Sequence, residues 1–295
     1  MSTAERDRGP VALDEVVRSA ARSLAAAGVP SPDADAVALA AHVLGCADEE
    51  VRRRMLLRHE VDADVQRSYG ALVAERAQRI PLQHLTGVAA FRHLTLRVGP
   101  GVFVPRPETE VVAQAAVDEA LGGGPHPLVV DLCTGSGAIA LAIASEVPGA
   151  RVIGVEIDAL AIGWAQANRA ATGLEVELLH DDATAALPEL EGTVDVVVSN
   201  PPYIPEGMEP LDPEVRDHDP AVALYGGSED GLRIPLAVGA RAARLLRPGG
   251  LLVMEHADSH GRSLPERLER TGAWCELADH LDLSGRPRFV TARRR

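Results

Sequence analysis

The order of apolar and polar positions divides the chain into two parts of different character. Residues 11–80 are dominated by Ala, Leu, Val and Arg, which favour helices, and the pattern breaks at Gly28 to Pro32 and near Gly45. From residue 127 onward, short and continuously apolar runs alternate with helical segments. Apolar strands separated by helices are typical of a parallel sheet covered on both faces. We therefore expect a small helical part followed by an α/β domain.

The second part is expected to contain strands that are mostly followed by helices. The strands are predicted at residues 128–132, 151–157, 176–180, 194–199 and 250–255, with a closing pair at 274–277 and 288–291. The helices are predicted at residues 138–145, 159–171, 232–246 and 264–272, and an earlier helix begins after Pro105 and ends near Leu121.

A β-hairpin is predicted between the two parts. Residues 90–98 alternate at their end with the period of a strand, Gly99-Pro100-Gly101 forms a turn, and residues 102–104 form the second strand. We therefore expect an N-terminal helical domain at residues 1–85, a β-hairpin linker at 86–104 and the α/β domain at 105–295.

Composition and charge restrict the partners of the chain. The 295 residues carry a net charge of −14, and all 29 basic residues are arginine. This acidity disfavours sequence-independent phosphate binding, and two Trp, three Tyr and three Phe are too few for a base-stacking platform. We therefore do not expect a nucleic-acid partner. Without lysine, the chain also cannot form a lysine Schiff base.

The cysteines and the lengths of the apolar runs indicate a cytoplasmic protein. Cys46, Cys133 and Cys275 are scattered without metal-ligand spacing, so no metal site is expected. No apolar run approaches the length of a membrane span, and the polar residues 1–10 lack the apolar core of a signal peptide. We expect no membrane partner.

The stretch Ser199-Asn200-Pro201-Pro202-Tyr203 follows directly on a predicted apolar strand. A side-chain amide, two prolines with fixed φ and a tyrosine can bind a planar NH2 group by two hydrogen bonds and pack a ring beside it. Asn-Pro is also common in surface turns, so this stretch alone leaves both interpretations open.

A glycine-rich turn lies between a predicted strand and a predicted helix, in the run Asp131-Leu132-Cys133-Thr134-Gly135-Ser136-Gly137. In an open α/β sheet, ligands bind beyond the carboxyl ends of the strands. Glu156 follows Gly137 by 19 residues at the tip of the next strand, where a carboxylate can accept both hydroxyl hydrogens of a ribose. A nicotinamide dinucleotide and S-adenosylmethionine both fit such a turn.

Two further positions favour S-adenosylmethionine as the cofactor. Asp131 suits a ligand with a cationic sulfonium and an ammonium group, and it would repel a pyrophosphate. Asp182, at the tip of the third strand, is placed to meet the adenine amino group. The Asn200 turn, at the tip of the fourth strand, then lies beside the reactive methyl group.

Methyl transfer to a planar NH2 group accounts for the residue types in the Asn200 turn. The Asn200 side-chain oxygen and the Pro201 carbonyl can each accept one N–H, which aims the nitrogen lone pair at the methyl carbon. Both oxygens stabilise the positive charge that develops on nitrogen more in the transition state than in the ground state. Tyr203 either packs on the flat acceptor group or is a core tyrosine with a bonded hydroxyl. Adenine, cytosine, guanine and glutamine all carry such an NH2 group, so the substrate stays open.

Several blocks of sequence carry a resemblance to one family. They are Pro81 to Gly87, Val104 to Glu110, Asp131 to Ala140, Asn200 to Ile204, Asp219-Pro220 with Ala223 to Gly227, Asp230 to Leu232, and Asp282 to Arg286. Over nearly its whole length the chain resembles the bacterial release factor glutamine methyltransferases. The glycine turn is shared by many methyltransferases, whereas the Pro-Arg-Pro-Glu-Thr-Glu block is far more specific.

The resemblance implies a Rossmann-like, seven-stranded S-adenosylmethionine-dependent methyltransferase domain, preceded by the β-hairpin linker and a helical domain that recognises the substrate. It implies methylation of the side-chain amide nitrogen (N5) of the Gly-Gly-Gln glutamine in class I peptide-chain release factors, which supports translation termination. A ribosomal-protein glutamine methyltransferase and a nucleic-acid amino methyltransferase remain as alternatives, as does a binding module without activity.

The resemblance also assigns site residues. The implied cofactor contacts are Asp131, Cys133, Thr134, Gly135, Ser136, Gly137, Glu156, Asp182, Ala183 and Asn200. The implied substrate contacts are Asn200, Pro201, Pro202 and Tyr203, of which Asn200, Pro201 and Tyr203 are expected to be catalytic.

Four positions depart from the usual pattern of the family. Cys133 stands where glycine is commoner, so its side chain has to point away from the cofactor or crowd it. Glu156 replaces the more usual aspartate, which keeps the charge and lengthens the reach. Ala183 lacks a larger side chain that can pack on adenine, so a lower cofactor affinity is expected, and His260 stands where glutamine is usual.

Overall fold

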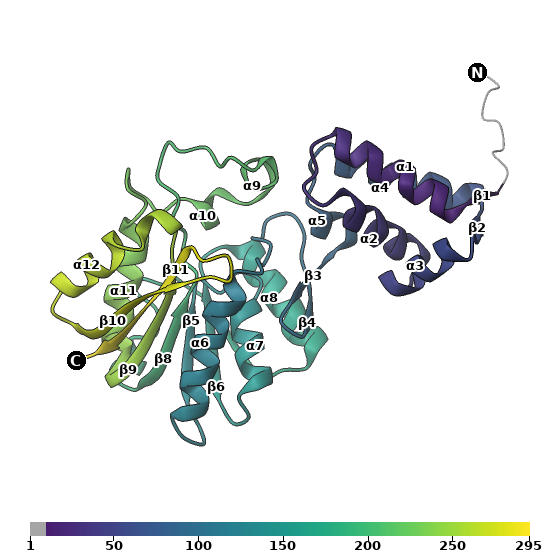
Figure 1. Cartoon of the computed structure of the whole chain (residues 1–295). Coiled ribbons are helices and arrows are strands. Elements are labelled where there is room, and N and C mark those ends of the chain that lie inside the picture. The colour runs from purple at the N-terminus through teal and green to yellow at the C-terminus, as the bar shows by residue number, and fades with distance from the viewer. Residues whose placement is uncertain (1–9) are drawn as a thin grey trace. The chain divides into compact units, whose positions relative to one another are not determined.

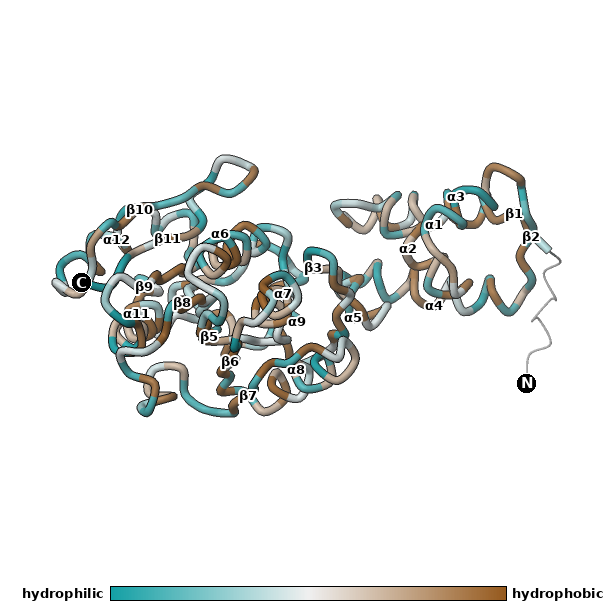
Figure 2. The backbone as a smooth tube through the Cα atoms, turned by 90° about the horizontal axis from the view of Figure 1, so that it is seen from below, coloured by the Kyte–Doolittle hydropathy of each residue, from teal (hydrophilic) through white to brown (hydrophobic). Residues whose placement is uncertain are grey.

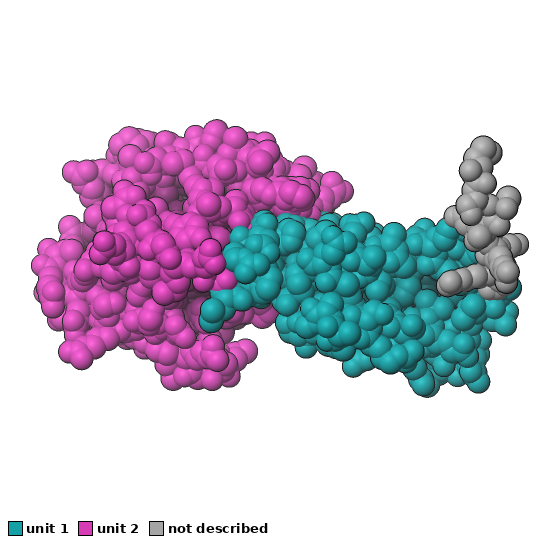
Figure 3. Space-filling view, turned by 90° about the horizontal axis from the view of Figure 1, so that it is seen from above, with its two compact units in different colours: residues 1–87, 211–218 teal, residues 88–210, 219–295 magenta. Residues whose placement is uncertain are grey.

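The computed structural model describes residues 10–295, and the chain divides into two units. Unit 1 contains the residues up to Gly87 together with Leu211–His218, and unit 2 contains Val88–Pro210 and Asp219–Arg295 (Figure 3). The chain therefore passes between the units three times. Within residues 10–295, no helix combines the length and the apolar character needed to cross a membrane.

Unit 1 is helical, as the first part of the sequence pattern predicts. Its helices are α1 (Leu13–Ala26), α2 (Pro32–Leu44), α3 (Asp48–Leu56), α4 (Ala63–Ala77), α5 (Leu82–Thr86) and α9 (Pro213–His218), and β1 (Val11–Ala12) pairs with β2 (Glu60–Val61). Local sequence features determine where some of these helices begin and end. Pro32 lies in the first turn of α2, Gly45 ends that helix with a φ of 61°, and the Asp62 side chain caps α4 by accepting from two backbone amides.

An arginine buried in unit 1 joins α9 to the N-terminal helices. Arg76 is 3% exposed; its Nε donates to Asp35 at 2.7 Å and its Nη2 donates to Glu214 at 2.7 Å. The neighbouring Arg79 also bonds Glu214, at 3.0 Å, and bonds Asp212 at 3.1 Å. The carboxylates of Asp35 and Glu214 are themselves largely shielded from water, so their charges need these arginines: Asp35 is paired with Arg76, and Glu214 with both Arg76 and Arg79. These contacts explain why the segment Leu211–His218 belongs to unit 1.

Unit 2 is built on a seven-stranded sheet with the order β10-β11-β9-β8-β5-β6-β7 (Figure 1). The strands are β5 (Leu128–Leu132), β6 (Arg151–Glu156), β7 (Glu177–His180), β8 (Val194–Ser199), β9 (Leu246–Glu255), β10 (Trp274–Leu281) and β11 (Pro287–Arg294). The strands from β9 to β7 in this order are parallel, whereas β11 pairs antiparallel with both of its neighbours. β5 is the strand of this sheet that comes first along the chain, and it has β6 on one side and β8 on the other. The strand order therefore reverses there, which is where open α/β sheets bind ligands.

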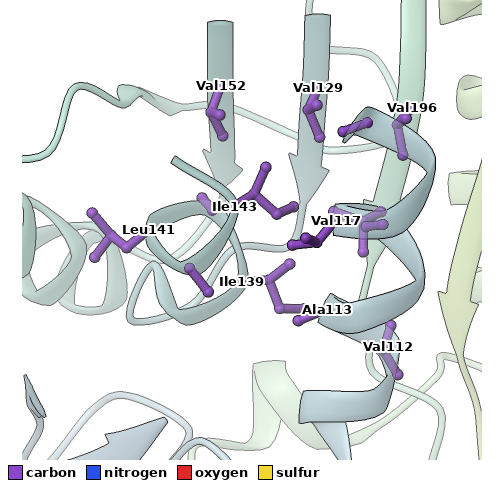
Figure 4. Close-up of a cluster of buried hydrophobic side chains, with 14 of the residues drawn as sticks. Val112, Ala113, Val117, Val129, Ile139, Leu141, Ile143, Val152 and Val196 are labelled. Carbon is purple, nitrogen blue, oxygen red and sulfur yellow. The ribbon is translucent and has the colours of Figure 1, made fainter. Parts of the chain in front are cut away.

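Helices cover both faces of this sheet. The covering helices are α6 (Thr109–Gly122), α7 (Ala138–Glu146), α8 (Ala159–Thr172), α11 (Arg233–Leu245) and α12 (Ser263–Arg270). Unit 2 also contains the short helix α10 (Ala221–Leu224) and the 3-10 turns η1 (Pro188–Leu190) and η2 (Asp258–His260). Val129, Val152 and Val196 pack with apolar residues of α6 and α7 (Figure 4). Their neighbours Val130, Ile153 and Val197 lie in a second core cluster, with residues of α11 and α12. Successive side chains of a strand alternate between faces, which explains why these strands are continuously apolar.

The hydropathy of the backbone follows this layering. Figure 2 shows hydrophobic segments in the central strands of the sheet and in the helices α6 and α7 that cover it. The predicted strands and helices of this unit are present, with their ends shifted by a few residues, and the closing strands β10 and β11 are longer than predicted.

The hairpin lies earlier in the chain than predicted. Its strands are β3 (Val88–Phe91) and β4 (Leu94–Arg97), joined by a tight turn at Arg92 and His93. Arg92 has a φ of 53°, its backbone amide donates to Glu110 at 2.9 Å, and its guanidinium bonds Glu146. These contacts hold Arg92 in the left-handed backbone conformation. Because that conformation favours glycine, an arginine there gives no turn signal in the sequence.

The predicted second strand at residues 102–104 is wrong. Val102 and Val104 are buried with Val98 and Ala161 in a small apolar cluster but pair with no strand. The glycine-rich stretch before them packs on α8 instead of turning a hairpin. A Cβ atom at Gly99 would lie 2.7 Å from the Trp164 ring.

Candidate active site

Four neighbouring strands of unit 2 end at one edge of the sheet, and each end carries polar residues. Asp131 lies near the end of β5, Glu156 ends β6, Asn200 follows β8 and Glu255 ends β9. The register pairs the last residue of β5 with Ser199 of β8, and Ser199 with a residue near the end of β9. The parallel arrangement therefore brings together carboxylates and an amide from distant parts of the sequence.

Asp131 is fully buried and holds the start of the glycine loop, residues 133–137. One of its oxygens, Oδ2, accepts the Thr134 hydroxyl at 2.5 Å and the Ala140 amide at 3.1 Å. The other, Oδ1, is buried and has no hydrogen-bond partner among the described residues. Burial is the main cause that raises the pKa of Asp131 to about 7, and Glu156 contributes in the same direction. A buried carboxylate oxygen without a partner is a place where a cationic ligand would be stabilised.

The glycine loop and Glu156 are bonded to one another. The Gly135 amide donates to Glu156 Oε2 at 2.8 Å, and the amides of Ile157 and Asp158 donate to Oε1, each at 2.9 Å. Burial raises the pKa of Glu156, while these three amides act against that shift. Asn168 of α8 donates to the Ser136 carbonyl at 3.0 Å and so fixes the middle of the loop. A carboxylate has about four lone-pair positions, so Glu156 keeps acceptor capacity for a ligand hydroxyl.

Cys133 occupies a backbone conformation that favours glycine. Its φ is 66°, in the left-handed region, which explains why glycine would be usual at this position. Its side chain packs against the core cluster of α11 and α12, and burial raises the pKa of its thiol. Cys133 is therefore a packing residue of the loop with a protonated thiol.

Asp182 and Ala183 follow the end of β7. Asp182 Oδ1 accepts both the amide and the hydroxyl of Thr184 at 2.8 Å, which closes a local turn. Ala183 is buried in the core cluster, where a larger side chain would need space. The Asp181 amide donates to the Glu156 carbonyl at 3.0 Å, so this tip lies beside the end of β6.

The Asn200 turn is held at the end of β8. The Ser199 hydroxyl donates to the Leu132 carbonyl at 2.6 Å, and the Asn200 amide nitrogen donates to the Thr109 hydroxyl at 3.4 Å. Pro201 and Pro202 are buried, and the Ile204 amide after the turn donates to the Leu224 carbonyl at 2.7 Å. The bond to Thr109 directs the amide nitrogen into the protein and leaves Asn200 Oδ1 as an acceptor.

Tyr203 is bonded to a glutamate that the sequence interpretation did not single out. Its hydroxyl donates to Glu255 Oε1 at 3.2 Å, and burial raises its pKa. Glu255 is 2% exposed, and burial raises its pKa to about 7 against the opposing effects of Thr109 and Arg288. The Tyr203 hydroxyl thus behaves as expected for a core tyrosine, and packing of its ring on a substrate stays a prediction. An acid at the tip of an apolar strand, the signal that identified Glu156, could have identified Glu255.

Two blocks of the sequence meet beside this turn. Arg106 donates to Asp219 Oδ2 at 2.7 Å, and the Asp219 side chain is fully shielded from solvent. The Arg106 guanidinium also lies 5.1 Å from the centroid of the Phe103 ring. The Pro-Arg-Pro-Glu-Thr-Glu block therefore makes two contacts in unit 2: Arg106 bonds Asp219, and Thr109 accepts from Asn200.

Comparison with known proteins gives two family matches and close relatives. The PrmC N-terminal domain model matches residues 15–87, and the methyltransferase small domain model matches residues 108–210. The release factor glutamine methyltransferase of Streptomyces coelicolor is 51% identical over 94% of this chain and 96% of its own length. That of Mycolicibacterium smegmatis is 50% identical over 96% of this chain and 98% of its own length.

A solved structure is similar to a large part of the chain. The T. thermophilus 16S rRNA N2 methyltransferase, in complex with AdoMet and guanosine, matches 70% of this chain and 50% of its own chain. The TM-score is 0.50 and the sequence identity is 28%. The match supports a methyltransferase fold, and the ligand in that structure agrees with S-adenosylmethionine as the cofactor.

Proposed function

The chain belongs to the release factor glutamine methyltransferase family, and we propose that its acceptor is the Gly-Gly-Gln glutamine of class I peptide-chain release factors. Its reaction is the S-adenosylmethionine-dependent methylation of a release factor glutamine. The observation that carries the proposal is the Asn200 turn, whose side-chain oxygen is left as an acceptor at the carboxyl edge of the sheet.

We propose that the cofactor is held at the ends of β5, β6 and β7. When bound, S-adenosylmethionine supplies a methyl group on a cationic sulfonium. Asp131 offers a buried oxygen without a partner to that positive charge, and Glu156, which already accepts from three amides, keeps a lone pair for a ribose hydroxyl. The proposed contacts are Asp131, Cys133, Thr134, Gly135, Ser136, Gly137, Glu156, Asp182, Ala183 and Asn200.

The acceptor amide is proposed to bind at the Asn200 turn. Asn200 Oδ1 and the Pro201 carbonyl accept the two N–H groups of the glutamine side chain, and Pro202 and Tyr203 form the adjacent wall. Because proline fixes φ, the Pro201 carbonyl is oriented before the substrate arrives. No strong base is needed, because a quaternised amide nitrogen loses its proton readily to water.

We also propose which part of the chain recognises the release factor and in which compartment the protein acts. We infer that the helical domain at residues 1–85 recognises the release factor, with a separate family match over residues 15–87 in support. The net charge of −14 supports a protein substrate over nucleic acid. Acting on release factors would place the protein in the cytoplasm.

Transfer of labelled methyl groups tests the proposed substrate. The purified protein is incubated with labelled S-adenosylmethionine and, in parallel, with a class I release factor, ribosomal proteins, RNA or DNA. We expect label in the release factor alone. Label in a ribosomal protein or in nucleic acid, with none in the release factor, would replace the proposal by the corresponding alternative.

Two glycines of the loop allow cofactor contact to be separated from folding. A Cβ at Gly135 would meet no atom within 4 Å, whereas one at Gly137 would lie 3.3 Å from Leu141 and 3.4 Å from Ala165. Both glycines have positive φ, so alanine costs about 1–2 kcal/mol of conformational strain at either site. We expect Gly137→Ala to lose more stability, and Gly135→Ala to lose more affinity for S-adenosylmethionine, because its open space is where the cofactor would approach. Thermal unfolding and calorimetry measure both, and unchanged cofactor binding in Gly135→Ala would contradict the assignment of the loop.

A further inference from the structure

The Asn200 amide can act as an acceptor only if its oxygen, and not its nitrogen, faces the substrate. A side-chain amide is nearly symmetric in shape, so its orientation is set by the groups that it bonds. In unit 2 the Asn200 nitrogen donates to the Thr109 hydroxyl at 3.4 Å. Thr109 is 4% exposed and is the first residue of α6, so the helix holds it in place.

The Thr109 hydroxyl can also donate a hydrogen bond to Glu255. Having accepted from Asn200, this hydroxyl has its own proton free to donate. Hydrogen bonding by Thr109 lowers the pKa of Glu255, against the effect of burial. Glu255 already accepts the Tyr203 hydroxyl through Oε1 at 3.2 Å. Its Oε2 is buried and has no hydrogen-bond partner among the described residues, so acceptor capacity remains for the Thr109 proton.

Resting on the proposed function, we propose that Glu255 and Thr109 are positioning residues that orient the Asn200 amide so that its oxygen receives the substrate N–H. Glu255 accepts the Tyr203 hydroxyl through Oε1, and its Oε2 is left to accept from the Thr109 hydroxyl that Asn200 bonds. An ionised carboxylate can only accept, so it forces both hydroxyls to donate toward it. The Thr109 oxygen is then left to accept from Asn200, and the direction of every bond in the network follows from one charge.

This arrangement also determines which acceptor groups are recognised. An outward-facing oxygen on Asn200 pairs with the NH2 group of a carboxamide and is repelled by a carboxylate. A glutamine is therefore accepted and a glutamate is rejected, because a buried acceptor facing an acceptor has no compensating hydrogen bond.

Replacing Glu255 by glutamine tests the network, because Glu255→Gln keeps the shape and introduces donors where only acceptors stood. We expect kcat for release factor methylation to fall about 100-fold, the loss typical of a misplaced reacting group, while the Kd for S-adenosylmethionine stays unchanged. Thr109→Val removes the hydroxyl at nearly constant shape and should lower kcat similarly, and Thr109→Ser should recover most of that loss. Thr271→Val is the matched control, since the Thr271 hydroxyl bonds only backbone groups at the end of α12, and it should keep the wild-type rate.

The pH profile separates an orienting role from a merely structural one. The charged and titratable groups facing Glu255 are Tyr203, Arg288 and Glu108. At saturating S-adenosylmethionine, whose positive charge keeps Asp131 ionised, the wild-type rate should fall as the pH drops through about 7, where Glu255 becomes protonated and can donate. This acid limb should disappear in Glu255→Gln.

The outcomes distinguish this proposal from the function on which it rests. Methylation of a release factor by the wild-type protein tests the function, and the variants test the network. If Thr109→Val folds and turns over at the wild-type rate, or if Glu255→Gln keeps both the rate and the acid limb, the positioning role is overturned. If Glu255→Gln does not fold, the comparison of Thr109→Val with Thr109→Ser decides: equal rates would overturn the proposal.

Discussion

The Asn200→Ala variant is expected to lose turnover by about 100- to 1,000-fold, the effect of removing one donor or acceptor that stabilises a transition-state charge. Alanine removes the oxygen proposed to accept a substrate N–H and leaves the Pro201 carbonyl as the remaining acceptor. The nitrogen lone pair is then no longer held in line with the methyl group. The measurement is kcat with labelled S-adenosylmethionine and a release factor.

Cofactor binding provides the control for this variant. Asn200 is itself a proposed cofactor contact, but Asp131, the glycine loop and Glu156 are unchanged in Asn200→Ala, so the Kd for S-adenosylmethionine should rise far less than kcat falls. A second variant, Asn200→Asp, keeps an acceptor but loses the donor to Thr109, and it should recover only part of the rate. Near-normal turnover in Asn200→Ala would show that the two-acceptor account of the turn is wrong.

Loss of the buried arginine in unit 1 should have the largest effect on stability. Arg76→Leu removes the arginine paired with the largely buried Asp35, whereas Glu214 keeps its ion pair with Arg79. Breaking a buried ion pair on one side costs about 3–5 kcal/mol, because an uncompensated charge remains in a poorly solvated place. We expect unit 1 to unfold at a markedly lower denaturant concentration than in the wild type.

The two tryptophans allow this loss to be located. Trp164 and Trp274 both lie in unit 2, so their fluorescence reports that unit, whereas circular dichroism reports the helices of both. Arg76→Leu should shift an early part of the dichroism transition and leave the tryptophan transition almost unchanged. Arg53→Leu is the control, because its pair with Glu50 is exposed, and it should change neither. Coinciding, unshifted transitions in Arg76→Leu would contradict the role given to the buried arginine.

Much of unit 2 was predictable because burial on both faces leaves a strong signal. The runs around Val130, Ile153 and Val197 are almost continuously apolar, and short apolar runs between helical segments are typical of strands in a covered parallel sheet. The hairpin was misplaced because a glycine-rich stretch normally indicates a turn. Here Gly99 is needed for close packing on Trp164, and Arg92 turns the chain through contacts with distant glutamates.

The site was only partly predictable for a related reason. Asp131, Glu156 and Asn200 stand beside recognisable local features, a glycine loop and strand tips, so sequence alone singles them out. Glu255 also stands at a strand tip, but its link to Tyr203, like that of Thr109 to Asn200, is a contact across a long separation in the chain. The membership of Leu211–His218 in unit 1 likewise depends on Glu214 meeting Arg76, which no local pattern encodes.

The most direct test of the account is to locate the transferred methyl group in the release factor itself. After incubation with S-adenosylmethionine, peptide mapping by mass spectrometry should find one added methyl on the glutamine of the Gly-Gly-Gln motif. A release factor in which that glutamine is replaced should accept no label. Label that persists after the replacement would contradict the assignment of the Asn200 turn to this glutamine.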